Sequence, residues 1–136
     1  MSITLSKINS FVENLAEKKI DLSGAVLTVA LTNTAHTATW DDLADLTQIS
    51  YTNLSARVLT VSTSEQTSGT YKLVLADLTL TASGAVGPFQ YIYIYDDGST
   101  GDKLCWYYDY GIPLTMANGD TFKLDFDAAT GVLTII

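Results

Sequence analysis

Residues 89–95 read FQYIYIY, and this stretch decides the fold. Successive side chains of a β-strand point to opposite faces, so the three tyrosines share one face and the two isoleucines share the other. Both faces are therefore apolar, which is typical of a strand buried on both sides. We predict a strand over residues 89–95 at the centre of a sheet.

A second aromatic strand follows it. Residues 96–102 read DDGSTGD, a cluster of turn-forming residues, and residues 103–110 are again rich in aromatic side chains. This order predicts a hairpin. Within its second strand, Trp106, Tyr108 and Tyr110 recur at period two and share one face. Aromatic rows of this kind are typical of a core, of a subunit interface or of a sugar-stacking platform, and all three interpretations are open.

Shorter strand patterns surround the hairpin. Residues 25–32 alternate, with Leu27, Val29 and Leu31 on one face. Further strands are predicted over residues 57–62, 71–75, 78–81, 121–126 and 132–136, with turns at 64–69, 83–88 and 127–131. Because no helices alternate with these strands, we predict a mainly β fold, an antiparallel β-sandwich or barrel.

The clearest helical pattern lies near the start of the chain. The apolar residues Ile8, Phe11, Val12 and Leu15 fall on one stripe of a 3.6-residue helix. We predict one N-terminal amphipathic helix over about residues 6–19, with Ser6 as its N-cap. A helix of this length is marginal alone, so it packs on the sheet or on a neighbouring molecule. A capping-box pattern at residues 39–42 predicts a short helical turn through Leu46.

Composition predicts one folded domain over residues 1–136. Hydrophobic residues make up 47% and charged residues 16% of the chain, against roughly 25% charged in an average soluble domain, which excludes a disordered chain. The net charge is −8 and the seven basic residues are scattered, so we expect no nucleic-acid partner. No signal peptide is visible and no apolar run approaches the roughly 20 residues of a membrane span, so we expect no membrane partner.

No residue pattern points to catalysis, so we predict that the protein is not an enzyme. The single histidine, His36, lies in a polar loop without a nucleophile motif, and we expect it to be solvated. The single cysteine, Cys105, lies in an apolar run and is expected to be a buried thiol, which fits folding in a reducing cytoplasm. Zinc-ligand spacing and calcium-loop spacing are both missing. We therefore predict no catalytic residues, no cofactor and no metal. The acidic loop at residues 96–102 is expected to be a hydrated turn, and a weak cation site there is the open alternative.

Segments spread over nearly the whole chain carry a family resemblance. They are residues 7–16 (KINSFVENLA), 27–35 (LTVALTNTA), 67–73 (TSGTYKL), 87–89 (GPF), 109–111 (DYG) and 118–126 (NGDTFKLDF). In these segments the chain resembles a family of small virion structural proteins of tailed bacteriophages. The resemblance implies a capsid decoration (cement) protein that stabilises the head shell by binding between capsomers.

The resemblance also implies partners and a location. The partners would be the major capsid protein and further copies of the chain, as in a trimer, on the capsid exterior after synthesis in the host bacterial cytoplasm. Weak contacts repeated over a symmetric lattice stabilise a shell through avidity. A second possibility is a tail, neck or fibre component whose aromatic strands bind host-surface glycans. The residues expected at an interface are Phe11, Leu15, Tyr91, Tyr93, Tyr95, Trp106 and Tyr108.

Overall fold

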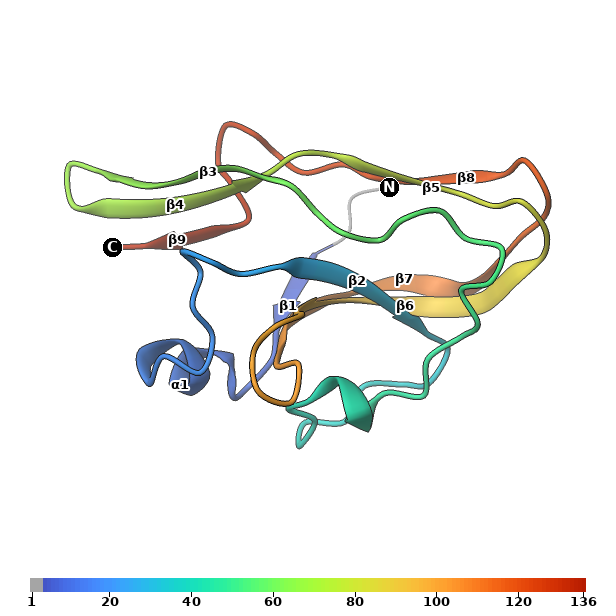
Figure 1. Cartoon of the computed structure of the whole chain (residues 1–136), viewed down its shortest axis with the longest axis horizontal. Coiled ribbons are helices and arrows are strands. Elements are labelled where there is room, and N and C mark those ends of the chain that lie inside the picture. Colours follow the sequence, from blue (N-terminus) through green and yellow to red (C-terminus); the bar gives the residue numbers. More distant parts are fainter. Residues whose placement is uncertain (1–3) are drawn as a thin grey trace.

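The computed structural model describes residues 4–136 as nine strands and two short helical segments (Figure 1). The strands are β1 (Leu5–Lys7), β2 (Leu27–Thr32), β3 (Val61–Thr67), β4 (Thr70–Leu75), β5 (Leu78–Thr81), β6 (Val86–Asp96), β7 (Leu104–Met116), β8 (Thr121–Leu124) and β9 (Leu133–Ile135). The helical segments are α1 (Phe11–Ala16) and the 3₁₀ helix η1 (Leu43–Asp45).

The strands form three sheets in two layers. One layer is a four-stranded sheet in the order β1-β7-β6-β2, and the sheets β3-β4-β9 and β5-β8 lie over it (Figure 1). Every pair of neighbouring strands is antiparallel. The prediction of a mainly β fold with antiparallel strands and one short helix near the N-terminus is thus confirmed. The choice between sandwich and barrel stays a prediction, as does the single domain over 1–136, of which residues 1–3 lie outside the described part.

The predicted central strand lies where the pattern places it. β6 runs between β7 and β2, and both Tyr93 and Ile94 are fully buried. The strand begins earlier than predicted, because Val86 still pairs with Met116 inside the expected turn at residues 83–88. The pairing register shifts between Val86 and Phe89, so the irregular Gly-Pro step is accommodated without ending the strand. β7 continues correspondingly to Met116, beyond the predicted end at residue 110.

The register of β6 and β7 puts their two aromatic rows on opposite faces. Tyr93 lies opposite Tyr107, whereas Trp106 lies opposite Ile94. Residues directly opposite each other in an antiparallel pair point to the same face. The row that starts at Trp106 therefore shares the isoleucine face, which looks toward the second layer, and the tyrosine row of β6 faces the other way.

The predicted helix over residues 6–19 is wrong in its start. Residues 5–7 form β1, in which Ser6 pairs with Tyr107 of β7, so Ser6 is not an N-cap. The N-cap of α1 is Ser10. The physical reason is that the edge of β7 offers the backbone a ladder of hydrogen bonds, while a short isolated helix is marginal in water.

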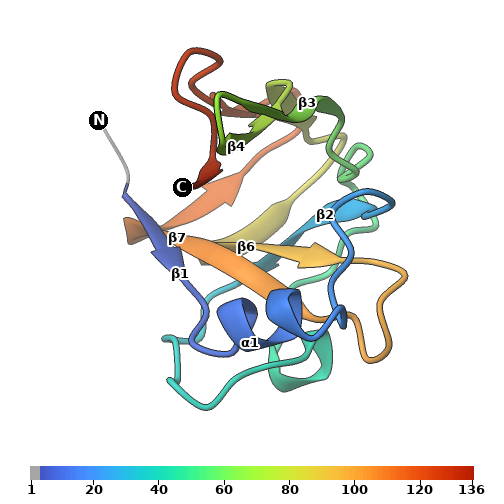
Figure 2. The same ribbon diagram turned by 90° about the vertical axis from the view of Figure 1, so that its left-hand side faces the viewer.

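The helix also ends earlier than predicted and buries a narrower face. Lys18 has a φ of +62°, a left-handed conformation that cannot continue a helix. Phe11 is 2% exposed and meets Trp106 edge-on at 6.0 Å between ring centroids, whereas Val12 is 50% exposed. Of the two packing alternatives, α1 therefore packs within its own chain, beside β1 and β7 (Figure 2).

β3 occupies residues that were predicted as part of a strand over 57–62 and as a turn over 64–69. The turn itself is only Ser68 and Gly69, whose φ values of +51° and +85° match the two-residue hairpin turn that needs positive φ at both positions. β3 lies at the edge of its sheet and both of its faces are largely exposed, so its residues can be polar. Hydrophobic alternation cannot detect such a strand.

Several smaller predictions are close. β4, β5, β8 and β9 fall within about one or two residues of the predicted strands. The capped helical turn forms as η1, although its capping residue is Asp42 and not residue 39. Asp45 Oδ2 accepts a hydrogen bond from the Asp42 backbone N at 3.0 Å, which closes the capping box.

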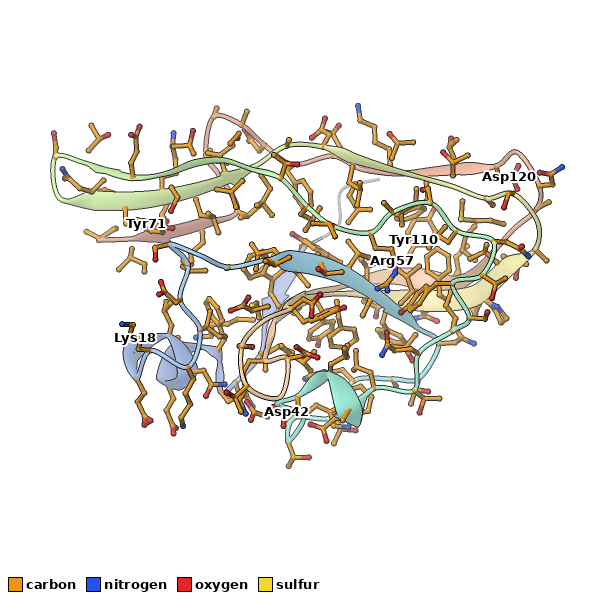
Figure 3. All side chains as sticks on the ribbon, viewed as in Figure 1. Lys18, Asp42, Arg57, Tyr71, Tyr110 and Asp120 are labelled. Atoms are coloured by element: carbon orange, nitrogen blue, oxygen red, sulfur yellow. The ribbon has the colours of Figure 1, made fainter. Side chains whose placement is uncertain are left out.

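The outer edge of β2 is covered by residues 48–59, which makes all six residues of β2 buried. Val29 N donates to Arg57 O at 2.9 Å, and Leu59 N donates to Leu27 O at 2.8 Å. The Arg57 guanidinium lies 3.7 Å from the centre of the Tyr51 ring and donates to Val29 O (Figure 3). This segment closes the sheet edge without being a strand.

Candidate functional site

Four of the seven predicted interface residues lie inside the chain. Phe11, Tyr93, Tyr95 and Trp106 are each at most 5% exposed. A partner cannot reach them in the folded chain, so the core interpretation describes these four. The other three, Leu15, Tyr91 and Tyr108, are partly buried, and for them the interface role stays a prediction.

The structure brings only some of the seven together. Phe11 and Trp106 are in contact, and Tyr91 and Tyr93 follow each other on one face of β6. Tyr108 lines a cavity of about 470 Å³ between the layers, beside Ile92 and Phe122. Leu15 lines a different cleft, together with Tyr71 and Ile135. The seven residues therefore form no single surface.

An aromatic cluster covers the tyrosine face of β6. It consists of His36, Trp40, Tyr93 and Tyr107. His36 stacks on Tyr107 at 4.3 Å between ring centroids, Tyr107 stacks on Tyr93 at 5.1 Å, and Trp40 meets His36 edge-on at 5.6 Å. The expectation that His36 is solvated is wrong, because the loop after β2 folds back over the sheet and carries its ring onto the tyrosines.

His36 has one polar partner in this cluster. Its Nδ1 lies 2.8 Å from the Tyr93 hydroxyl. Partial burial lowers the pKa of His36, and burial raises the pKa of Tyr93, so both groups are held in their neutral forms near neutral pH. A neutral hydrogen bond inside an aromatic stack fastens the loop to the sheet.

We expect acid to weaken this attachment. Above a pH of about 6.5 His36 is neutral in both the folded and the unfolded chain. As the pH is lowered below that value, the unfolded chain binds a proton before the folded chain does, because the pKa of His36 is lowered in the folded state. The free energy of unfolding therefore decreases as the pH decreases. Urea unfolding of the wild type should show this loss between about pH 6.5 and 5, and His36→Phe, which keeps a stacking ring, should flatten it.

Identical pH profiles for the wild type and His36→Phe would contradict this prediction. His36 is the single histidine of the chain, so no second imidazole contributes in that window. Burial raises the pKa of Asp96, which changes stability in the opposite direction: its contribution is lost as pH rises through its folded pKa. The comparison with His36→Phe cancels this term, since Asp96 is present in both proteins.

A polar network fixes the far end of the same loop. It consists of Ser10, Asn14, Asp41, Asp42 and Lys103. Lys103 Nζ lies 2.7 Å from Asp41 Oδ2 and 2.6 Å from Asp42 Oδ1. The second oxygen of Asp41 accepts hydrogen bonds from Ser10 Oγ and from Asn14 Nδ2, the latter at 2.8 Å. Residues from α1, the η1 region and the start of β7 are thereby tied at one point.

The network keeps Asp41 ionised. Burial works against the charged carboxylate, but hydrogen bonds from Lys103, Ser10 and Asn14 lower the pKa of Asp41 to about 2. The same two carboxylates raise the pKa of Lys103. Within residues 4–136, no group of three or more His, Cys, Asp or Glu side chains is placed to hold a metal ion. The network is thus a set of ion pairs and hydrogen bonds that joins the α1 region, the η1 region and the residue before β7.

Cys105 is fully buried, as predicted. Burial raises the pKa of its thiol, so the reactive thiolate form is disfavoured. Among the described residues, no helix has the length and hydrophobicity needed to span a bilayer.

An open cleft of about 370 Å³ lies between the α1 region and β9. We call it the β9 cleft, and its apolar lining is Leu15, Ile20, Leu22, Tyr71 and Ile135. Tyr71 and Lys18 mark its two sides in Figure 3. Ile135 is 45% exposed there. Branched apolar side chains that border a cleft in this way are available for contact with another molecule.

Sequence reasoning missed Trp40, Lys103 and the two aspartates that Lys103 binds. The partners of these residues are distant in sequence, as for Asp41 and Lys103, which are 62 residues apart. One signal was present: a polar loop that contains a tryptophan next to paired aspartates is unusual, because tryptophan is highly buried on average. That signal favours a loop that packs on the domain, although it names no partner.

Three comparisons complete this description of the chain. No model of a protein family, no curated protein and no solved structure matches it.

Proposed function

We propose that the protein is a structural component of a tailed-phage virion, a capsid decoration protein that binds between capsomers on the outside of the head shell. The observation that carries the proposal is the resemblance in residues 7–16, 27–35, 67–73, 87–89, 109–111 and 118–126. These segments consist largely of turns and strand ends, and they contain no active-site signature.

The geometry supports this role in two ways. Long loops are fastened to the sheet: the aromatic cluster holds residues near His36, and the network around Lys103 holds residues near Asp41. The exposed apolar side chains, such as Val12, Ile112 and Ile135, are spread over several elements. A rigid domain with scattered apolar contact points suits weak contacts that add up over a lattice.

The glycan-binding alternative needs an exposed aromatic platform on β6 and β7. Tyr93, Tyr95 and Trp106 are buried, and the register places the two aromatic rows on opposite faces. We therefore do not carry this alternative forward.

Heat stability of particles tests the proposal. Particles assembled without the protein should release their DNA at a lower temperature than complete particles, and adding back the purified protein should restore the difference, because a ligand that binds only the intact shell stabilises it. Dye-detected thermal melting measures the release temperature, and electron microscopy of restored particles counts the copies. Equal melting of shells with and without the protein, or failure of the added protein to bind, would contradict it.

A further inference from the structure

The cavity between the two layers has mainly apolar walls. One wall comes from β1, β6 and β7, and the other comes from β8 and the turn after it, whose positions Figure 1 shows. Its volume of about 470 Å³ lies within the roughly 300–1,000 Å³ of ligand pockets, and it is about three times that of an engineered apolar cavity that binds benzene. The apolar side chains of the lining are Leu5, Ile92, Phe122, Leu124, Phe126 and Val132.

The charged residues of the lining stand at the mouth of the cavity. Lys123, Asp125 and Asp127 are all exposed, and Lys123 faces Asp77 at 3.4 Å, whereas Leu124 between them is 7% exposed. Two carboxylates at the mouth, in a chain of net charge −8, repel an anion. An apolar interior disfavours a charge of either sign. The cavity therefore suits an uncharged molecule.

Tyr108 brings a polar group to these apolar walls. Burial raises the pKa of Tyr108 to about 12, so its hydroxyl keeps its proton near neutral pH and can donate it. The Trp106 indole opposes this rise, and it is the one hydrogen-bonding group among the described residues that acts on the Tyr108 hydroxyl. Because an indole N–H only donates, the proton of Tyr108 has no acceptor within residues 4–136.

A second donor without a partner lies beside Tyr108. Trp106 is 2% exposed, and its Nε1–H makes no hydrogen bond of normal geometry with a described residue. Buried polar groups of folded proteins nearly always have a partner. A hydroxyl can accept one hydrogen bond while it donates another, so Tyr108 can accept from the indole once its own proton is held. Two neighbouring donors thus point to an acceptor atom in the cavity beside Tyr108.

Water fits this position less well than an apolar molecule does. A buried water needs about two to four polar partners, but the residues directly opposite Tyr108 on the neighbouring strands are Leu5 and Ile92. A molecule with an apolar body and a single acceptor oxygen covers these walls and holds the one proton. The rings of Phe122 and Phe126 in the lining favour an aromatic body.

We propose that this cavity is a binding site for a small uncharged aromatic molecule that carries one hydrogen-bond-accepting oxygen, as an aryl ketone does. The ligand oxygen accepts from the Tyr108 hydroxyl, the Tyr108 oxygen accepts from Trp106 Nε1–H, and the ring of the ligand packs against Ile92 and Phe122. The site goes beyond the proposed role on the shell and does not depend on it.

A matched pair of ligands tests the acceptor. Acetophenone carries a ketone oxygen on an aromatic ring, whereas ethylbenzene has nearly the same shape and no acceptor. We expect acetophenone to bind the wild type with a dissociation constant of about 0.1–1 mM, as suits so small a molecule. In Tyr108→Phe its binding should weaken about three- to tenfold, and that of ethylbenzene should change less than about twofold, because only the ketone loses a hydrogen bond. Titrations followed by NMR measure both ligands.

Tyr107→Phe is the control for the lost hydroxyl. Tyr107 is the preceding residue of β7, so its side chain points to the opposite face of the sheet, where it stacks on Tyr93. The same chemical change at this position should leave the binding of both ligands unchanged.

The Trp106 indole gives a local readout in the unaltered protein. The chain has two tryptophans, so its NMR spectrum contains two indole N–H signals, which Trp40→Phe assigns. Acetophenone should move the Trp106 signal and leave the Trp40 signal in place, because Trp40 packs near Tyr93 on the other face of the sheet. Absence of any shift of the Trp106 signal up to about 5 mM acetophenone, well above the expected dissociation constant, would overturn the site.

Filling the cavity tests its location. Val132→Phe places a ring in the lining and should abolish acetophenone binding, whereas Val58→Phe, the same change at a 53% exposed position, should not. Circular dichroism confirms that each variant is folded, and the indole titration of the wild type decides on its own if one is not. Unchanged binding by Val132→Phe, or equal losses for both ligands in Tyr108→Phe, would contradict the proposal and leave the decoration role as it stands.

Discussion

Trp106→Ala is expected to lower the free energy of unfolding by about 3–5 kcal/mol, because it removes a large, fully buried side chain and leaves a cavity. The ring of Trp106 packs edge-on against Phe11 and is paired across the strands with both Lys7 and Ile94. Its loss therefore loosens α1, β1 and the central hairpin together. Urea unfolding monitored by circular dichroism measures the change, and a typical domain has only about 5–15 kcal/mol to lose.

The variant Trp106→Phe separates the contribution of side-chain packing to stability from the contribution of the indole N–H group. The Trp106 Nε1 is buried and makes no hydrogen bond of normal geometry among the described residues, although the Tyr108 side chain is near enough for the indole to oppose the rise in the pKa of Tyr108. A phenyl ring keeps much of the packing and removes this unsatisfied donor, whose burial is unfavourable by about 1–3 kcal/mol. We therefore expect Trp106→Phe to be much less destabilising than Trp106→Ala. A loss as large as that of the alanine variant would mean that the indole N–H has a partner in solution.

Lys103→Met is expected to lower the free energy of unfolding by about 1–2 kcal/mol at neutral pH. The methionine keeps the apolar stem, but Asp41 and Asp42 lose the ammonium group that lies within 2.7 Å of both. The side chains of these aspartates are 36% and 37% exposed, so solvent screens part of the repulsion and the effect stays below that of a fully buried pair. Lys123→Met is the matched control, because Lys123 makes only an exposed 3.4 Å contact with Asp77.

The same variant should change the response to acid. In the folded wild type the pKa of Asp41 is about 2, below its unfolded value near 3.8, so its contribution is complete above pH 3.8 and is lost as pH falls toward 2. Without Lys103 the folded pKa rises toward the unfolded one, and the loss between about pH 4 and 2 becomes smaller. Unfolding measured across that range checks this. An equally steep loss in Lys103→Met would show that Ser10 and Asn14 alone hold the carboxylate.

The sequence predicts the centre of this fold well because the centre depends on local pattern. Six of the seven residues of FQYIYIY are apolar or aromatic, and they occupy both faces of a strand, which favours a strand that is buried on both sides. The buried thiol of Cys105 follows from the apolar run around it for the same reason. In these segments the local pattern of apolar residues is enough to predict both the strand and the burial of its side chains.

The predictions are wrong where the structure of a segment depends on contacts with residues that are distant in sequence. Ser6 becomes part of a strand because β7, about a hundred residues later, offers it an edge. The side chain of His36 is partly buried against Tyr93 and Tyr107, and the sequence of its own loop does not reveal these partners. β3 is a strand although it is polar, since it needs only β4 beside it. Long-range pairing, more than local preference, sets these three elements.

The strand order also dictates when the chain can fold. β1 and β2 find their partners only in β7 and β6, and β4 pairs with β9, so most of the sheet consists of contacts between residues far apart in sequence. Chains of high contact order fold slowly, in about milliseconds to seconds. During synthesis β1 and β2 therefore stay without their strand partners until β6 and β7 have been made, so the four-stranded sheet can close only after the ribosome has passed Met116.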